Sequence, residues 1–439
     1  MLEPKSLIQI ITEEEFLNLA QEPCNRFFEF FNSFVVCLSS GVDISRKFYA
    51  DLNQEAEYLE TFLDSYGARE NKRWIFFSEY VASIRNLGLG AFFIRHLMDR
   101  YPFYNLRDEE DTQKEFYKQA QAALDFINDS IRRLYQEIIL AGEANGLKVA
   151  KSGDCIQKDS DIESNKRLPK NISQDDVTNE EDIIIALCEK VKMTARMMKD
   201  AAIKRTDDVS ELKKLIPAKL NEQRARLFVN HVHTVQSEFD TYVKNTRIEQ
   251  ENPDLKLLRG AVSMSLHLLE TVLWLCHFYE RHEDEIRIDE SKKKIALMVD
   301  KNQLFAHIIN FAYHFGNHFI SESSKIADEL LLTFVKTIQV EVSVPQPLGF
   351  HARPSTYISL IARQYDEDLF LIIDGEKINA HSVMSLLQAG GLIADKGYQT
   401  VTFEGSKRMI EDIKTLARNN YCEKGEIPRS LSYLSAARK

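Results

Sequence analysis

Apolar residues recur at intervals of three and four along most of the chain up to residue 335. This spacing predicts amphipathic helices, and glycines or prolines near several breaks mark where helices end. Two groups of four helices are expected, over 13–34, 45–66, 71–101 and 111–140, and over 180–204, 222–246, 255–283 and 302–334. We therefore predict two all-α helical bundle modules, at residues 1–145 and 182–335.

A polar stretch separates the two predicted modules. Residues 146–181 contain no Phe, Tyr or Trp and are rich in Lys, Asp, Glu, Ser and Asn. Such a segment buries too little apolar area to offset the loss of chain entropy. We interpret it as a flexible linker or a long excursion of the chain.

The pattern changes near residue 336, after which the chain alternates short strands and helices. Gly and Pro become denser there: residues 336–439 hold 7 Gly and 4 Pro, against 9 Gly and 6 Pro in residues 1–335. The predicted order is βαββαβα, which implies an antiparallel sheet with helices on one face. We expect this α/β domain, an open-faced sandwich, at 336–425 and a C-terminal tail at 426–439. The fold class is thus multidomain, α plus α/β.

Charge and composition exclude several kinds of partner. The net charge is −11 and no block of Lys and Arg resembles an electrostatic footprint for a phosphate backbone, so we expect no nucleic-acid partner. The most apolar segments, 27–40 and 260–279, carry Glu or His, so we expect no membrane insertion.

The N-terminus lacks the pattern of a signal peptide. The six cysteines are scattered without a Cys-x-x-Cys pair, and we interpret them as reduced, which favours a cytoplasmic location.

The residues with the clearest chemistry lie between the first strand and first helix of the C-terminal domain. Gly349, Phe350 and His351 precede Arg353 and Pro354, and Pro354 fits the first turn of a helix. His351 is therefore expected at a helix N-terminus, where backbone N–H groups and the helix dipole favour an anion. Arg353 supplies a permanent charge for phosphate oxygens. This combination predicts a reversible phosphohistidine at His351.

The stretch 336–422 resembles HPr, the phosphocarrier of the bacterial phosphoenolpyruvate-dependent sugar phosphotransferase system. The resemblance rests on Gly349, Phe350, His351, Arg353 and Pro354, together with the order of strands and helices. It implies that Enzyme I phosphorylates His351, that Arg353 stabilises the phosphoryl group, and that a sugar-specific or regulatory protein accepts the phosphate. It implies a phosphotransfer protein rather than a stand-alone enzyme, with no cofactor.

The same resemblance implies roles for the second helix of that domain. Ser382 corresponds to a serine that an ATP-dependent kinase phosphorylates in many HPr proteins, although this chain has His381 where Lys often precedes it. A structural N-cap is the more economical interpretation of Ser382, because serine is a preferred N-cap. Phe350, Val383, Met384 and Leu387 are expected to form the apolar docking surface for Enzyme I and acceptors. The connection 388–397, from this helix to the last strand, looks about three residues longer than is usual in HPr proteins.

Two alternatives remain for the function. The C-terminal domain could dock partners without phosphate transfer, making the protein a non-catalytic helical scaffold. The helical region could instead sense a metal or a small ligand, since His307, His314, His318 and Glu322 fall on one face of the last predicted helix. The spacing from His307 to His314 is too wide for one ion, so we expect packing or solvated histidines and no metal site. The helical modules could also form a homodimer.

Overall fold

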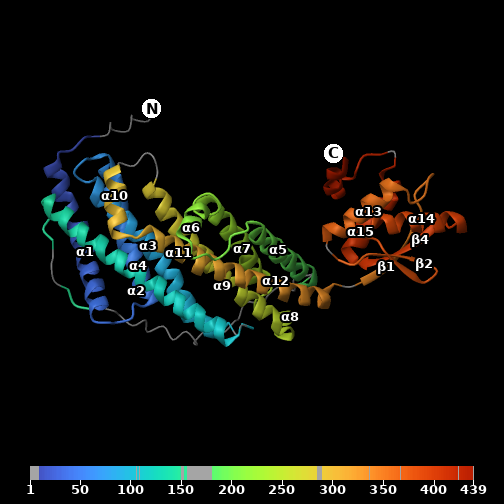
Figure 1. Cartoon of the computed structure of the whole chain (residues 1–439), viewed down its shortest axis with the longest axis horizontal. Helices are drawn as coiled ribbons and strands as arrows, with labels where there is room; N and C mark the ends of the chain where they lie inside the picture. The colour runs from blue at the N-terminus through green and yellow to red at the C-terminus, as the bar shows by residue number, and fades with distance from the viewer. Residues whose placement is uncertain are drawn as a thin grey trace, which may run out of the picture. The chain divides into compact units, whose positions relative to one another are not determined.

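The computed structural model describes residues 9–104, 106–107, 109–149, 153–155, 180–283, 289–335, 337–365, 367–423 and 425–438. By contacts the chain divides into two compact units, Met1–Leu330 and Leu331–Lys439 (Figure 1). We call them the helical unit and the C-terminal unit. The described residues of the helical unit form helices and no strand, and the C-terminal unit holds a four-stranded sheet with helices.

Most predicted helices form close to their expected ranges. The helical unit contains α1 (Glu13–Ser39), α2 (Arg46–Ser65), η1 (Ala68–Glu70), α3 (Ile75–Arg100), η2 (Tyr101–Phe103), α4 (Glu110–Ala144), α5 (Glu180–Asp200), α6 (Val209–Leu215), α7 (Glu222–Tyr242), α8 (Arg247–Glu251), α9 (Pro253–Glu283), α10 (Asp289–Met298), α11 (Lys301–Ala306), η3 (His307–Tyr313) and α12 (His314–Phe334). The last predicted helix is interrupted, because η3 is a π-helix.

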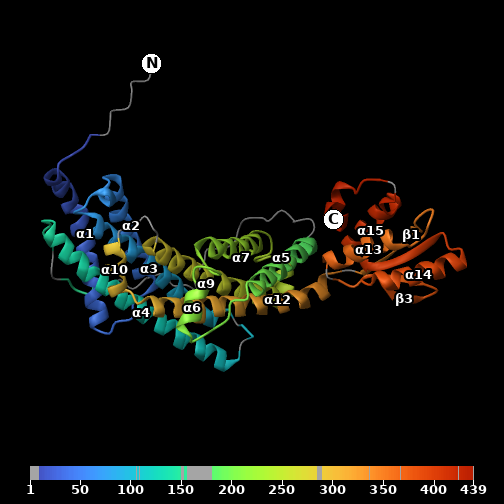
Figure 2. The same ribbon diagram turned by 45° about the horizontal axis from the view of Figure 1, so that its top comes forward.

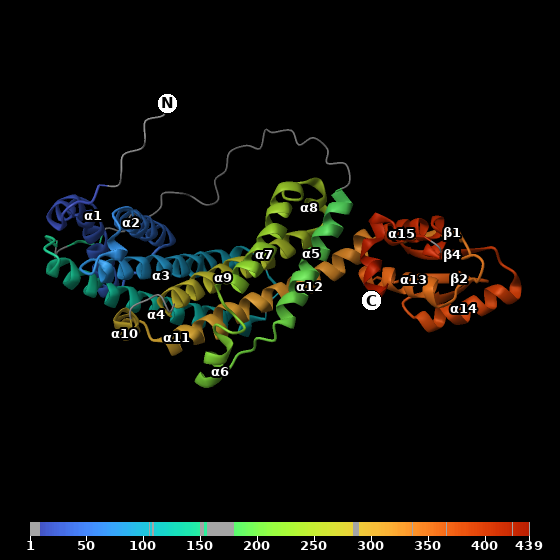
Figure 3. The same cartoon turned by 90° about the horizontal axis from the view of Figure 1, so that it is seen from above.

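The two predicted bundle modules are not separate compact units. Helix α3 of the first group packs along α9 of the second (Figure 3). Gly90 permits this approach, since a Cβ there would lie 3.2 Å from the side chain of Leu275. The ring of Phe116 on α4 also packs against Phe311 and Phe315, with centroids 5.8 and 5.3 Å apart. The modules therefore share one apolar core, which helix periodicity alone does not reveal because it gives no partner for each apolar face.

The apolar helix α9 was expected not to cross a membrane. By length and composition its segment Pro253–His282 could do so, but 78% of the most apolar window is buried inside the protein. Its neighbours α3 and α7 cover it. Helix α9 is therefore mostly buried inside the helical unit.

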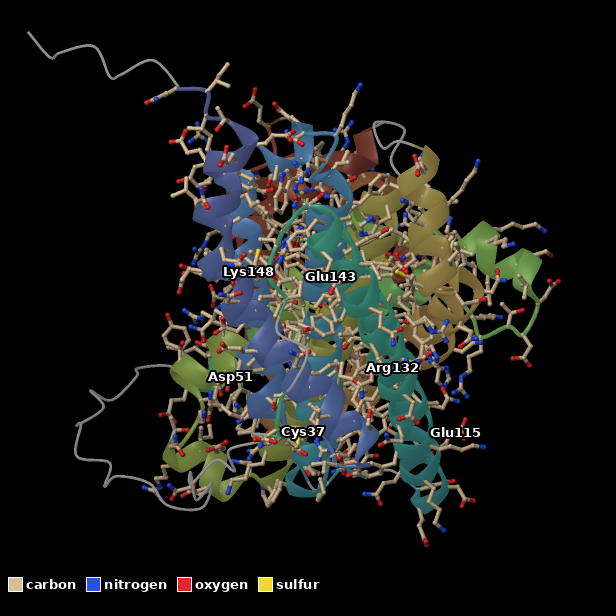
Figure 4. All side chains as sticks on the ribbon, turned by 90° about the vertical axis from the view of Figure 1, so that its left-hand side faces the viewer. Cys37, Asp51, Glu115, Arg132, Glu143 and Lys148 are labelled. Carbon is tan, nitrogen blue, oxygen red and sulfur yellow. A yellow bond between two sulfur atoms is a disulfide. The ribbon has the colours of Figure 1, made fainter. Side chains whose placement is uncertain are left out.

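The start of the predicted linker is packed rather than flexible. Leu147 is buried, and the side-chain amide of Gln21 exchanges two hydrogen bonds with the backbone of Lys148, at 2.9 and 3.0 Å. Further along, Cys155 forms a disulfide with Cys37 at the end of α1 (Figure 4). Residues 150–152 and 156–179 of that segment lie outside the described residues.

The disulfide corrects the interpretation of the six cysteines as reduced. Cys37 and Cys155 are separated by 118 positions, so only the folded backbone brings them together. The pairing also removes the support that cysteine usage gave to a reducing compartment. Burial raises the pKa of the Cys24 thiol to about 12, so little of it is the reactive thiolate near pH 7.

We expect this disulfide to appear in a simple alkylation experiment. Denatured protein alkylated without reductant should gain two fewer alkyl groups than protein reduced first, because two of the six sulfurs are bonded to each other. Intact-protein mass measures the difference, and peptide mapping should join the peptides of Cys37 and Cys155. A Cys155→Ser variant is the control, since it should remove the cross-linked peptide. Equal alkylation in both conditions would contradict the pairing.

The C-terminal unit follows the predicted order βαββαβα. Its elements are β1 (Thr337–Ser343), α13 (Ala352–Tyr365), β2 (Phe370–Ile373), β3 (Glu376–Asn379), α14 (Val383–Lys396), β4 (Thr400–Ser406), α15 (Lys407–Arg418), η4 (Asn420–Cys422) and η5 (Arg429–Arg438). The sheet order is β1-β4-β2-β3, and the paired strands are antiparallel. Figure 2 shows the sheet, with β1 and β3 labelled.

One face of this sheet is apolar and the other polar. In β1, Val342 is buried and pairs with the buried Val401 of β4. Gln339 and Glu341 of the same strand are exposed. The buried face packs with α15 and α14. This alternation, readable in the sequence, is why the helices gather on one side.

The expected tail 426–439 contributes to the core of this unit. Leu431 and Leu434 of η5 are fully buried in the same apolar cluster as Phe403 and Ile410. The hydroxyl of Tyr433 also donates to Asp412 Oδ2 on α15 at 2.5 Å. The C-terminal unit therefore extends beyond the boundary expected at residue 425.

Candidate functional site

The loop between β1 and α13 fixes the backbone at His351. Gly349 has φ +66, a left-handed conformation that glycine adopts without strain. Its N–H donates to Pro345 O, and the His351 N–H donates to Gly349 O, both at 2.9 Å. Phe350 points inward, 3% exposed, against Phe403 and Tyr421. With its neighbour Phe350 held in the core, His351 has a defined position at the surface.

His351 is the N-cap of α13. Its carbonyl accepts the first helical hydrogen bond, from Ser355 N at 3.2 Å, and its Nδ1 lies 3.5 Å from the backbone nitrogen of Arg353. The side chain is 32% exposed. Nδ1 is therefore directed at the amide groups of the helix N-terminus, where the helix dipole stabilises negative charge.

A third element of the site was missed by the sequence analysis. Glu423 Oε1 lies 2.8 Å from His351 Nε2, and its side chain is 10% exposed. The carbonyl of the same residue accepts a hydrogen bond from Arg353 Nη1 at 2.8 Å. Glu423 thus contacts both residues of the predicted site. No motif marks it, because it lies 72 positions after His351 and only the fold brings the two together.

The segment before Glu423 is anchored to the loop that precedes His351. The side-chain amide of Asn420 pairs with the backbone of Gln346 at 2.6 and 2.9 Å. The hydroxyl of Tyr421 donates to Ser343 O at 2.9 Å, and burial raises the pKa of this phenol. These contacts fix the carboxylate of Glu423 beside the imidazole.

The same segment has an unusual backbone. Asn420, Tyr421 and Cys422 have φ of 45, 54 and 55, three successive left-handed residues without a glycine. Each such residue costs on the order of 1 kcal/mol or more, and strain of this kind concentrates at functional sites. The surrounding contacts of Asn420 and Tyr421 hold the strained conformation in place.

The four residues predicted for partner docking are not alike. Phe350 is buried, so its ring is not part of a surface, and that prediction is wrong. Met384 is 65% exposed, whereas Val383 and Leu387 are partly buried. Leu348 and Leu392, which the sequence analysis did not select, are 72% and 50% exposed. Phe350 is instead packed so closely that a Cβ at Gly390 of α14 would lie 2.6 Å from its carbonyl oxygen.

The segment 388–397, expected as a long connection, is mostly helix. Helix α14 continues to Lys396 and ends at Gly397, whose φ of 68 suits a helix C-terminus. The additional residues therefore extend the helix rather than loosen a loop. Its exposed Leu392 lies two turns beyond Met384 on the same helix.

Ser382 caps α14, as the preference of serine for this position predicts. Its Oγ accepts a hydrogen bond from Ser385 N at 3.2 Å. The neighbouring His381 is turned toward the protein, with Nε2 2.8 Å from Glu367 O.

We expect Ser382→Ala to lower the free energy of unfolding of the C-terminal unit by about 1 kcal/mol, because it removes this cap. Ser382→Asp should retain most of the stability, since a carboxylate also accepts from the helix N–H groups. Urea denaturation followed by circular dichroism measures both variants. Equal destabilisation by Ala and Asp would contradict a capping role.

The histidine series of the last predicted helix does not assemble a metal site. His307 lies in the π-helix η3, whereas His314 and His318 follow in α12, so the projected α-helical face is broken. Among the described residues, no group of three or more His, Cys, Asp or Glu side chains could hold a metal ion. Burial lowers the pKa of His307 and of His314 to about 4.

Comparison with known proteins bears on the C-terminal unit. Residues 338–418 match the family model described as the PTS HPr component phosphorylation site. No curated protein and no solved structure matched the chain. The matched range runs from β1 to the end of α15 and includes His351 at the start of α13. The C-terminal part of this chain is therefore an HPr-like domain, attached to a helical region that this match does not cover.

Proposed function

We propose that the protein is a phosphocarrier or regulatory protein of the phosphoenolpyruvate-dependent sugar phosphotransferase system, and that it accepts phosphate on His351 from Enzyme I. The observation that carries the proposal is the setting of the His351 ring. Nδ1 lies at the N-terminus of α13, while Nε2 lies 2.8 Å from the carboxylate of Glu423. The match to the family model over 338–418 supports it.

The geometry favours Nδ1 as the phosphorylated atom. The carboxylate of Glu423 is not aligned for a hydrogen bond to Nε2, but its negative charge beside this nitrogen favours the tautomer with the proton on Nε2 and leaves the lone pair on Nδ1. That lone pair forms the new P–N bond while the P–N bond of the donor phosphohistidine breaks, and the donor nitrogen keeps the bonding electrons. The Nε2 proton remains on the ring, which becomes positive, and the adjacent carboxylate stabilises this charge.

The remaining groups receive the phosphoryl oxygens. Once Nδ1 is bonded to phosphorus, the N–H of Arg353 and the other amides of the first turn of α13 can donate to the phosphoryl oxygens. The Arg353 side chain is exposed and held by the carbonyl of Glu423, so its guanidinium stays beside the site. Residues Met384, Val383 and Leu387 of α14 would contact Enzyme I and the acceptor. Ser382, at the start of that helix, is a candidate for a serine kinase.

Labelling tests the proposal directly. The full chain is incubated with Enzyme I, Mg²⁺ and ³²P-labelled phosphoenolpyruvate, and we expect one acid-labile, alkali-stable phosphate per chain. An established HPr protein serves as the positive control for the Enzyme I used. If several Enzyme I preparations label that control but not this chain, the C-terminal unit is a docking module without phosphate transfer.

Glu423 should act as a positioning residue for this reaction. We expect Glu423→Gln to slow phosphorylation about 10-fold or more, because an amide neither enforces one tautomer nor balances the ring charge. The readout beyond rate is the tautomer of the His351 ring: loss of the carboxylate should lower the share of rings that carry the proton on Nε2, followed by ¹⁵N NMR. Glu426→Gln, three residues further along, is the matched control. An unchanged phosphorylation rate and an unchanged tautomer of His351 in Glu423→Gln would contradict the role.

A further inference from the structure

A cavity of the helical unit lies against the only π-helical segment among the described residues. The cavity has a volume of about 440 Å³ and is lined from α4, from the connection between α5 and α6, and from the α11–η3 junction. Pockets of this size accommodate small metabolites. π-Helical turns are rare and often occur at functional sites.

Three hydrogen bonds fix the π-helix to the wall of the cavity. The Asn310 side chain accepts from Thr206 N and donates to Thr206 O, both at 3.0 Å. The Arg205 Nε donates to the Asn310 carbonyl at 2.8 Å. The connection after α5 and the irregular helix turn are thus held as one rigid pair, which preorganises the cavity.

The lining carries both signs of charge. Arg205 is 3.4 Å from Glu115 Oε1, which also accepts from the side-chain amide of Gln119 (Glu115 is labelled in Figure 4). With Nε and one Nη engaged, the other Nη of Arg205 has no acceptor among the described residues. Asp207 adds a second, exposed carboxylate. One guanidinium and two carboxylates therefore face the same space.

The remaining lining is uncharged. Ala122, Ala306 and Phe311 supply apolar surface. Burial lowers the pKa of His307 to about 4, so its imidazole is neutral near pH 7. A simple anion would meet two carboxylates here, and a simple cation would meet the arginine, so each is opposed by part of the lining.

We propose that this cavity binds a small zwitterion of the α-amino acid class. The ligand carboxylate would take the unengaged donors of Arg205, and the ammonium group would lie between Asp207 and Glu115. The ligand side chain would contact Phe311 and the two alanines. The proposal does not depend on phosphorylation of His351, since every residue involved belongs to the helical unit.

Calorimetric titration of the full chain with the common L-α-amino acids, each at millimolar concentration, tests this proposal. At least one should bind saturably with one site per chain. Propionate and propylamine, which carry only one of the two charges, should bind at least about tenfold more weakly. Absence of binding by every amino acid, or equal binding by either single-charge probe, would overturn the proposal.

Substitutions locate the binding. Asp207→Asn changes an exposed side chain and should weaken the amino acid at least about tenfold without altering the fold. Arg205→Met should abolish binding, with circular dichroism to verify that the loss of its bond to Asn310 has not unfolded the chain. Asp125→Asn, on α4 outside the cavity lining, is the matched control and should bind like the wild type. Wild-type affinity in Asp207→Asn would exclude this site, whatever the behaviour of Arg205→Met.

Discussion

Replacing His351 by alanine should abolish phosphate transfer from Enzyme I to this chain. The imidazole is the proposed nucleophile, and no other group at the site offers a nitrogen lone pair: Arg353 is a guanidinium and Glu423 a carboxylate. We therefore expect labelling to fall by at least about 10³-fold, to the level of a reaction without nucleophile. Quantification of acid-labile phosphate after short incubations measures the loss.

The same domain provides a matched control. His381 is the other histidine of residues 331–439, and its ring is bonded to the Glu367 carbonyl rather than placed at the start of α13. His381→Ala should label like the wild type. Because His351→Ala also removes an N-cap, its fold should be compared by circular dichroism and thermal melting. Substantial labelling of a folded His351→Ala protein would place the phosphate elsewhere.

Acid should destabilise the helical unit through histidines that are neutral in the fold. His267 on α9 and His96 on α3 have ring centroids 4.5 Å apart, and Arg46 Nη1 lies 2.9 Å from His96 Nδ1. Burial, followed by the charges of Arg46 and Arg100, lowers the pKa of His96 to about 4.

The pKa of His267 is lowered further, to about 3, first by burial and then by His96, Arg259 and Arg46. In the unfolded chain both histidines titrate near pH 6.5. Between that pH and the folded-state values the unfolded chain binds more protons, so stability is full above pH 6.5 and falls as the pH is lowered.

For His267 the loss between pH 7 and pH 5 amounts to about 1–2 kcal/mol of the free energy of unfolding. Urea denaturation of the full chain at several pH values between 7 and 5 measures it. In His267→Gln the free energy of unfolding should fall less between pH 7 and pH 5, by about 1–2 kcal/mol, because glutamine does not titrate. His233→Gln replaces an exposed histidine of α7 and should keep the wild-type dependence. If His267→Gln left the pH dependence of the free energy of unfolding unchanged, this account would be contradicted.

Several features of the C-terminal unit could be predicted because they depend on local sequence. Apolar and polar residues alternate from residue 338 to 342, a pattern typical of a half-buried strand, and β1 forms there. Asp374 and Gly375 are a two-residue turn sequence, and they connect β2 to β3. Ser382 was expected as a helix cap and caps α14. The position of His351 at the start of a helix also followed from Pro354 three residues later. Backbone preferences and side-chain caps act over a few residues, so the local sequence is sufficient to specify them.

The local sequence likewise specified the positions of helices in the first 335 residues, but it did not specify which helices pack against each other. An amphipathic stripe indicates that one face of a helix is buried, but it does not identify the element that packs against this face. The sequence therefore suggested two bundles, whereas α3 and α9 share one core. The same limit applies to Phe350: its apolar ring suited a docking surface or a core equally, and the packing of Phe403 and Tyr421 placed it in the core.

The chain by itself therefore determined where the strands and most of the long helices lie, and which imidazole lies at a helix N-terminus. Tertiary structure alone decided that Glu423 faces this imidazole, that Cys37 meets Cys155, and that α11 and α12 are joined by a π-helix beside a charged cavity. The physical reason is sequence separation: contacts between residues tens to hundreds of positions apart arise only when the packing of many side chains closes the intervening loops.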